Sequence, residues 1–161
     1  MSYDWFSVYG IELEYMVVDT TTLDVSPIAD TILAQLAGEP AAMEVELGPV
    51  CWSNELARHV LETKTNGPTN DLARSKADFG RAVSHMNAVL AAHGARLLPT
   101  GMHPWMLPDS EFKLWPFDEE GIYGTFDRIF ELSLDLGQTL DRRRVLQNFG
   151  ALRFLRFFDP V

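Results

Sequence analysis

Two glutamates near the start of the chain have the type and spacing to bind a divalent cation. Glu12 and Glu14 lie in residues 10–19, where apolar residues alternate in a pattern that predicts a β-strand. Residues two apart share one face of a strand, so both carboxylates would lie about 7 Å apart on one side. A hard cation such as Mg²⁺ or Mn²⁺ would relieve their repulsion. The alternative is an ordinary strand whose glutamates face solvent.

A second polar segment, residues 53–65, is compatible with two structures. A helix would place Glu55, His59 and Glu62 on one face. In a strand, Glu55 and Glu62 would face opposite ways unless a bulge or bend separated them. The β-branched residues of the second half favour a strand from about His59, preceded by irregular structure.

The composition limits the class of protein. A length of 161 residues with 47% apolar residues is enough for one domain with its own core. A formal charge of −10 argues against nucleic acid or an anionic membrane as the main partner. The solitary Cys51 excludes an internal disulfide and indicates a small buried residue. With neither a signal peptide nor a membrane-spanning apolar run in the sequence, we expect a cytoplasmic protein.

Further strands and helices must position these carboxylates. Ser26 and Pro27 predict the start of a short helix that ends at Gly38, and Asn70 predicts the cap of a long helix that ends near Gly94. Alternation predicts strands at residues 42–47, 50–52 and 96–98, with Glu44 and Glu46 on a solvated face. Residues 102–123 form a long loop rich in proline and tryptophan, which would either line a pocket or cover an edge of the sheet. A helix is expected at residues 122–136.

Four segments together resemble one family. They are Gly-Ile-Glu-Leu-Glu-Tyr at residues 10–15, Asn-Glu-Leu-Ala-Arg-His-Val-Leu-Glu-Thr-Lys-Thr at 54–65, Leu-Leu-Pro-Thr-Gly-Met-His-Pro at 97–104, and Leu-Trp-Pro at 114–116 with Ile-Tyr at 122–123. In this order they resemble the carboxylate–amine ligases akin to glutamate–cysteine ligase type 2. The resemblance covers roughly residues 8–130.

The resemblance implies an α+β, glutamine synthetase-like fold, in which a curved, mostly antiparallel sheet carries helices on its outer face. Family members are usually longer and continue into a histidine-bearing strand, so the fold is expected to be incomplete here. Residues 1–130 would be the N-terminal part of the catalytic domain. Residues 131–161 would be a divergent basic and apolar tail.

The resemblance also implies an activity, an ATP-dependent ligation that forms an amide of the γ-glutamyl-cysteine type through an acyl phosphate. The cofactor would be Mg²⁺ or Mn²⁺, and the partners would be ATP and small amino acids, with a second copy or a completing chain as a further expectation. An alternative is a truncated, non-catalytic remnant or interaction module of the family. It would keep the metal-binding strand and lack turnover.

Site residues carry over by motif. Glu12, Glu14, Glu55 and Glu62 would bind the metal, and Asn54, His59 and Thr63 would contact substrate or support the ligands. His103 matches a family position without a role that can be assigned to it, and no side chain is predicted to act as a nucleophile or general base.

Overall fold

The computed structural model describes residues 3–116. This part of the chain contains five strands and three helices, in the order β1 (Glu12–Asp19), α1 (Ala29–Ala37), β2 (Glu44–Leu47), β3 (Val50–Asn54), β4 (Val60–Thr65), α2 (Leu72–Ala91), β5 (Ala95–Leu98) and α3 (Pro108–Glu111). The expected helix at 122–136 and the tail at 131–161 lie outside the described residues.

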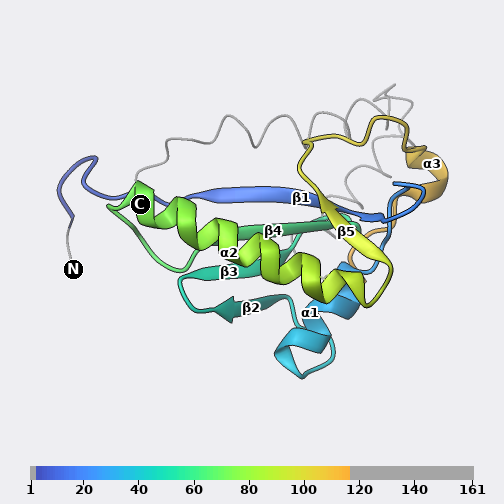
Figure 1. Cartoon of the computed structure of the whole chain (residues 1–161), viewed down its shortest axis with the longest axis horizontal. Helices are drawn as coiled ribbons and strands as arrows, with labels where there is room; N and C mark the ends of the chain where they lie inside the picture. The colour runs from blue at the N-terminus through green and yellow to red at the C-terminus, as the bar shows by residue number, and fades with distance from the viewer. Residues whose placement is uncertain (1–2, 117–161) are drawn as a thin grey trace, which may run out of the picture.

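The five strands form one sheet in the order β2-β3-β4-β1-β5, and each pair of neighbours is antiparallel. Figure 1 shows β2, β3, β4 and β1 stacked in this order, with α2 running obliquely across them. The sheet and its helices are compatible with the predicted α+β class. The finer glutamine synthetase-like assignment stays a prediction.

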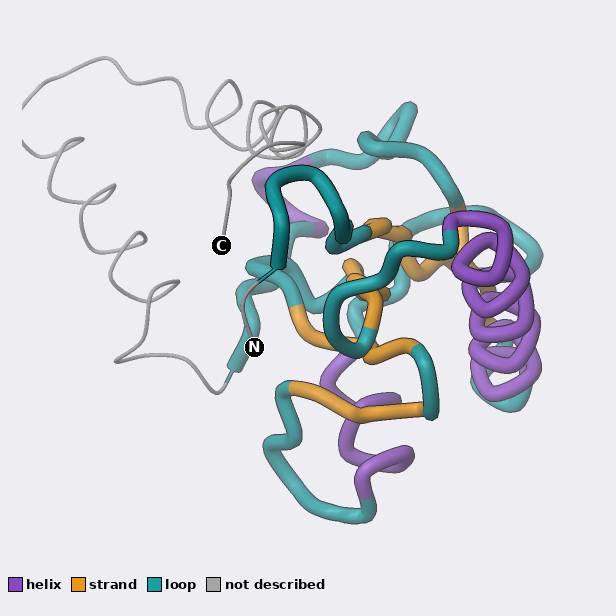
Figure 2. The backbone as a smooth tube through the Cα atoms, turned by 90° about the vertical axis from the view of Figure 1, so that its left-hand side faces the viewer, coloured by secondary structure: helices purple, strands orange, loops and turns teal. Residues whose placement is uncertain are grey.

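One face of the sheet carries the core, and α1 and α2 cover it. Val17, Trp52 and Leu61 from three strands pack with Ile32 of α1 and Met86 of α2 in a single buried cluster. Figure 2 shows α2 to one side of the strands. Because side chains alternate along a strand, the residues between these apolar positions lie on the opposite face, which is where the acidic side chains are found.

The short helix α1 begins two residues later than the sequence pattern predicted. The backbone N–H of Ser26 donates to the carbonyl of Val17 at 2.8 Å, which ties this residue to β1 and keeps it out of the helix. Ile28 is the N-cap instead, without a side-chain hydrogen bond. The C-terminal end is as predicted, since Gly38 adopts φ 75°, a left-handed conformation that glycine accepts without steric cost.

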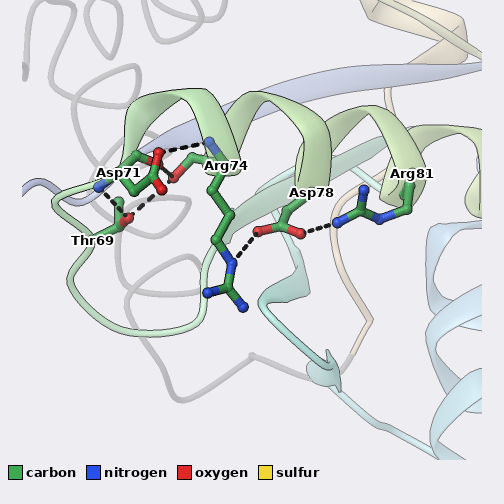
Figure 3. A network of polar contacts seen from close by, with 6 residues as sticks. Thr69, Asp71, Arg74, Asp78 and Arg81 are labelled. Carbon is green, nitrogen blue, oxygen red and sulfur yellow. Dashed lines mark hydrogen bonds and ion pairs between the residues drawn. The ribbon is translucent and has the colours of Figure 1, made fainter.

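The cap of α2 is Asp71, whereas Asn70 was predicted. An oxygen of Asp71 accepts the N–H of Arg74 at 2.9 Å, as Figure 3 shows. Further along the helix, Asp78 is bonded by Arg81 and lies 3.8 Å from the Nε of Arg74. Both arginines are largely exposed, so this network contributes little stability.

The segments after β4 differ from the prediction in two details, the end of α2 and the loop after residue 102. The helix ends at Ala91, and Gly94 follows it with φ 67° in the connection to β5. The predicted loop after residue 102 contains the short helix α3. Within residues 3–116, no helix is long and apolar enough to cross a bilayer.

Candidate metal centre

Four polar residues form a row across four strands on the face opposite the helices. Glu44 of β2 is the register partner of Ser53 in β3, Ser53 of Glu62 in β4, and Glu62 of Glu14 in β1. Directly opposite residues in antiparallel strands have Cβ atoms about 4.5–5.5 Å apart, so the sheet itself brings Glu14 and Glu62 together. Two like charges in this position destabilise a sheet unless something compensates them.

A third carboxylate completes a cluster. One ligand oxygen from each of Glu14, Glu55 and Glu62 lies within 4.8 Å of the others. Glu55 and Glu62 are only 8% and 6% exposed, and Glu14 is partly buried. Buried carboxylates at this spacing are much less common than exposed acidic groups, and they call for a compensating charge.

Glu55 reaches the cluster because the chain turns before β4. It lies in residues 55–59, between the end of β3 at Asn54 and the start of β4 at Val60. In one continuous strand, Glu55 and Glu62 would face opposite sides of the sheet. Because Glu55 lies in the turn, it is outside this alternation and can approach Glu62. The preferred interpretation of residues 53–65, irregular structure followed by a strand, is therefore confirmed, and the helix is excluded.

The turn is fixed by contacts on two sides. Nη2 of Arg58 donates to both carboxylate oxygens of Asp30 in α1, at 2.9 and 2.8 Å, and the N–H of Ala29 donates to the carbonyl of Arg58. On the other side, residues 112–115 run alongside the turn, with the N–H of Arg58 donating to Lys113 and that of Trp115 to Leu56.

The electrostatics of the cluster follow from crowding. Burial, followed by the charges of Glu55 and Glu12, raises the pKa of Glu62 to about 7. Glu12 itself is exposed at the edge of the cluster, on the same face as Glu14 and opposite Lys64 in register. Its carboxylate adds to the negative potential without being one of the three clustered groups.

A hydrogen-bonded network flanks Glu62 on the side of β3. Oγ of Ser53 donates to Oε1 of Glu62 at 3.0 Å, and Nζ of Lys64 donates to Oγ of Ser53 at 3.3 Å. Lys64 also lies 2.6 Å from Oε2 of Glu44 and 3.8 Å from Oε1 of Glu62. Three strands therefore contribute to the support of one carboxylate.

The three residues predicted to contact substrate or to support the ligands, Asn54, His59 and Thr63, differ in their surroundings. Asn54 precedes Glu55 and is buried, and its Nδ2 has no hydrogen-bond partner within residues 3–116. Thr63 is fully buried and, by alternation, faces away from Glu62 toward the helix side. The ring of His59 packs edge-to-face on Phe112 at 5.9 Å. Contacts of these residues with substrate stay predictions.

His103 has a structural role that the sequence did not reveal. Its Nε2 lies 2.7 Å from the carbonyl of Leu23, and its Nδ1 accepts the N–H groups of Trp105 and Met106 at 3.4 and 3.1 Å. The indole of Trp105 donates to Asp24 at 3.0 Å. These bonds attach the loop after β5 to the loop after β1.

Cys51 is a buried free cysteine, as predicted. Burial, together with the neighbouring Glu44, raises the pKa of its thiol to about 12. A thiol that stays protonated at neutral pH is a poor nucleophile.

Comparison with known proteins identifies the family of the chain. The sequence model of "Glutamate-cysteine ligase family 2 (GCS2)" matches residues 8–146. The chain belongs to this family. It is 32% identical over 123 residues to an uncharacterized protein of Archaeoglobus fulgidus, a match that covers 76% of the chain and 32% of the archaeal protein. The chain thus spans about a third of the length of that relative. No solved structure matches it.

The residues of the cluster fit a divalent cation that prefers oxygen. Glu14, Glu55 and Glu62 offer only carboxylate oxygens, which suit Mg²⁺ or Mn²⁺ better than softer metals. The sequence predicted these three together with Glu12, which is not one of the clustered groups, and it gave no role to Ser53 or Lys64. Alternation along β4 already places Lys64 on the face of Glu62, but the contacts of both residues with Ser53 of β3 follow only once the register of pairing is known.

Proposed function

We propose that this chain takes part in an ATP-dependent carboxylate–amine ligation, and that Glu14, Glu55 and Glu62 bind the Mg²⁺ of that reaction. The observation that carries the proposal is the convergence of three carboxylates, two of them buried, from β1, the 55–59 turn and β4. Membership of the glutamate–cysteine ligase family supports it, since that family suggests ATP-dependent ligase chemistry.

The chemistry explains why such a site is useful. A carboxylate does not accept an amine directly, because its oxygen is a poor leaving group. Transfer of the γ-phosphoryl group of ATP gives an acyl phosphate and ADP, and the amine then displaces phosphate to form the amide. Mg²⁺ at the cluster would neutralise charge on the phosphate oxygens. The role of the protein is to hold its carboxylates on β1, β4 and the 55–59 turn at the spacing that binds the cation.

Release of ADP by the full chain tests the activity. With saturating Mg²⁺, ATP, glutamate and cysteine, we expect ADP and a dipeptide to form in equal amounts. Glu62→Gln removes one charged ligand and should lower the rate by about 100-fold or more, because several kcal/mol of charge stabilisation depend on the cation. Glu46→Gln is the matched control, since Glu46 lies on the same face in β2 but bonds Asn66 and not the cluster.

The two hypotheses that the family resemblance allows, an active ligase and a non-catalytic module, predict different results in this assay. Binding of Mn²⁺ by the wild type without release of ADP would overturn the ligase activity and favour a non-catalytic, metal-binding module. Turnover that is the same in the wild type and in Glu62→Gln would overturn the assignment of the metal centre.

A further inference from the structure

We propose that Ser53 is a positioning residue for the metal-binding carboxylate of Glu62, and that Lys64 fixes the direction in which the Ser53 hydroxyl donates. This inference rests on the proposed function, because it needs a cation at Glu14, Glu55 and Glu62. It adds a residue pair to which neither the sequence pattern nor the family resemblance gave a role.

The direction of each hydrogen bond follows from the groups involved. An ammonium group only donates, whereas a hydroxyl has one proton to donate and lone pairs to accept. Because Nζ of Lys64 donates to Oγ of Ser53 at 3.3 Å, the single proton of Ser53 is directed to Oε1 of Glu62, 3.0 Å away. Oε1 of Glu62 is thereby held in place as a hydrogen-bond acceptor.

The position of Lys64 is itself determined by its partners. Its Nζ is 2.6 Å from Glu44, the register partner of Ser53, and 29% of its side chain is exposed. A half-exposed ion pair contributes only about 0–1 kcal/mol to stability. The contribution that remains is orientation: Glu44 keeps the ammonium group over the hydroxyl, and the hydroxyl keeps the carboxylate from rotating.

Groups that hold metal ligands commonly change metal affinity by about 10–100-fold when they are removed. The test measures Mn²⁺ binding to the full chain from the paramagnetic resonance signal of free Mn²⁺, and unfolding in EDTA in parallel. We expect Ser53→Ala to weaken Mn²⁺ binding by about tenfold or more while the chain stays folded. Ser53→Thr, which keeps the hydroxyl, should bind Mn²⁺ nearly as well as the wild type.

Ser84→Ala is the matched control. Its hydroxyl is exposed on α2 and donates to the carbonyl of Gly80 at 2.9 Å, away from the clustered carboxylates, so its removal should leave Mn²⁺ binding unchanged. If Ser53→Ala folds poorly, Ser53→Cys provides the same comparison, because a thiol fills the space but donates weakly.

Each outcome decides a separate question. Wild-type affinity in a folded Ser53→Ala chain, or equal losses in Ser53→Ala and Ser53→Thr, would overturn the positioning role and leave the metal centre intact. Absence of Mn²⁺ binding by the wild type would overturn the metal centre and this inference together.

Discussion

At the scale of single residues, Glu62 and His59 respond to burial in opposite ways. Burial raises the pKa of Glu62 to about 7, because the ionised carboxylate is the form that loses solvation. Burial lowers the pKa of His59 to about 4, with a smaller contribution from the charge of His103. In both cases the neutral form is favoured, and a bound cation would reverse this preference at Glu62.

His59 predicts a measurable dependence of stability on pH. The folded chain keeps this ring neutral down to about pH 4, whereas the unfolded chain protonates it below about 6.5. The unfolded state therefore binds more protons between these values, and stability is lost as the pH falls through that window. Relative to His59→Gln, the wild type should lose up to about 3 kcal/mol of unfolding free energy between pH 6.5 and 4.

Urea unfolding in EDTA across this pH range measures the effect. The comparison with the variant removes the contribution of Glu62, which has the opposite sign because its raised pKa makes the folded state bind protons more tightly. Parallel pH profiles for wild type and variant would contradict the assignment to His59.

At the scale of elements, the turn at residues 55–59 determines whether Glu55 reaches the cluster. Its contact with α1 includes the two hydrogen bonds from Arg58 to Asp30 and one backbone bond from Ala29, and its contact with residues 112–115 includes backbone bonds. The carboxylates on β1 and β4 are positioned by the sheet alone. Glu55 instead depends on the turn that contains it and on two segments that are distant in sequence, α1 and residues 112–115.

The variant Asp30→Asn tests this dependence. Loss of the charged partner should weaken Mn²⁺ binding several-fold and lower stability by about 1 kcal/mol, because the pair is partly exposed. Arg74→Gln is the control, since it removes a surface ion pair on α2 that has no contact with the turn. Unchanged Mn²⁺ affinity in a folded Asp30→Asn chain would show that the turn is held without the ion pair between Arg58 and Asp30.

The strands and the two longer helices were largely predictable, and the contacts between them were not. Alternating apolar residues identified β1 and β2, because that pattern depends only on local sequence. The caps of α1 and α2 were misplaced by one or two residues, since the backbone of Ser26 bonds to Val17 of the preceding strand β1 and Asp71 competes with Asn70. The carboxylates of the cluster were recognised from motifs, but Ser53 and Lys64 depend on register, which sequence alone does not give.

At the scale of the whole molecule, the charge is divided between the two faces of the sheet. The helix-covered face is apolar, whereas the other carries Glu12, Glu14, Glu44, Glu46 and Glu62 on its strands, with Lys64 among them. A chain with a net charge of −10 therefore concentrates like charge where the cation is proposed to bind. Without a cation, this face lowers the stability of the fold.

The stability of the full chain should accordingly depend on Mg²⁺. A ligand present at 100 times its dissociation constant stabilises the folded state by about 2.7 kcal/mol. We expect MgCl₂ to raise the melting temperature of the wild type relative to EDTA, and NaCl of equal ionic strength to raise it less. Glu62→Gln should melt higher than the wild type in EDTA, because repulsion is relieved, and should gain little from Mg²⁺. Equal responses in both chains would contradict the proposed site.

In the row of residues from Glu44 to Glu14, the charge at the site depends on how the strands are aligned with one another. If β4 moved by two residues along β1, Lys64 would lie opposite Glu14, and a closed ion pair would replace the pair of carboxylates. A shift by one residue would direct Glu62 into the apolar layer. Insertions or deletions within the 55–59 turn or β4 should therefore abolish cation binding even where the sheet still forms, whereas length changes in the loop before β2 leave the row intact.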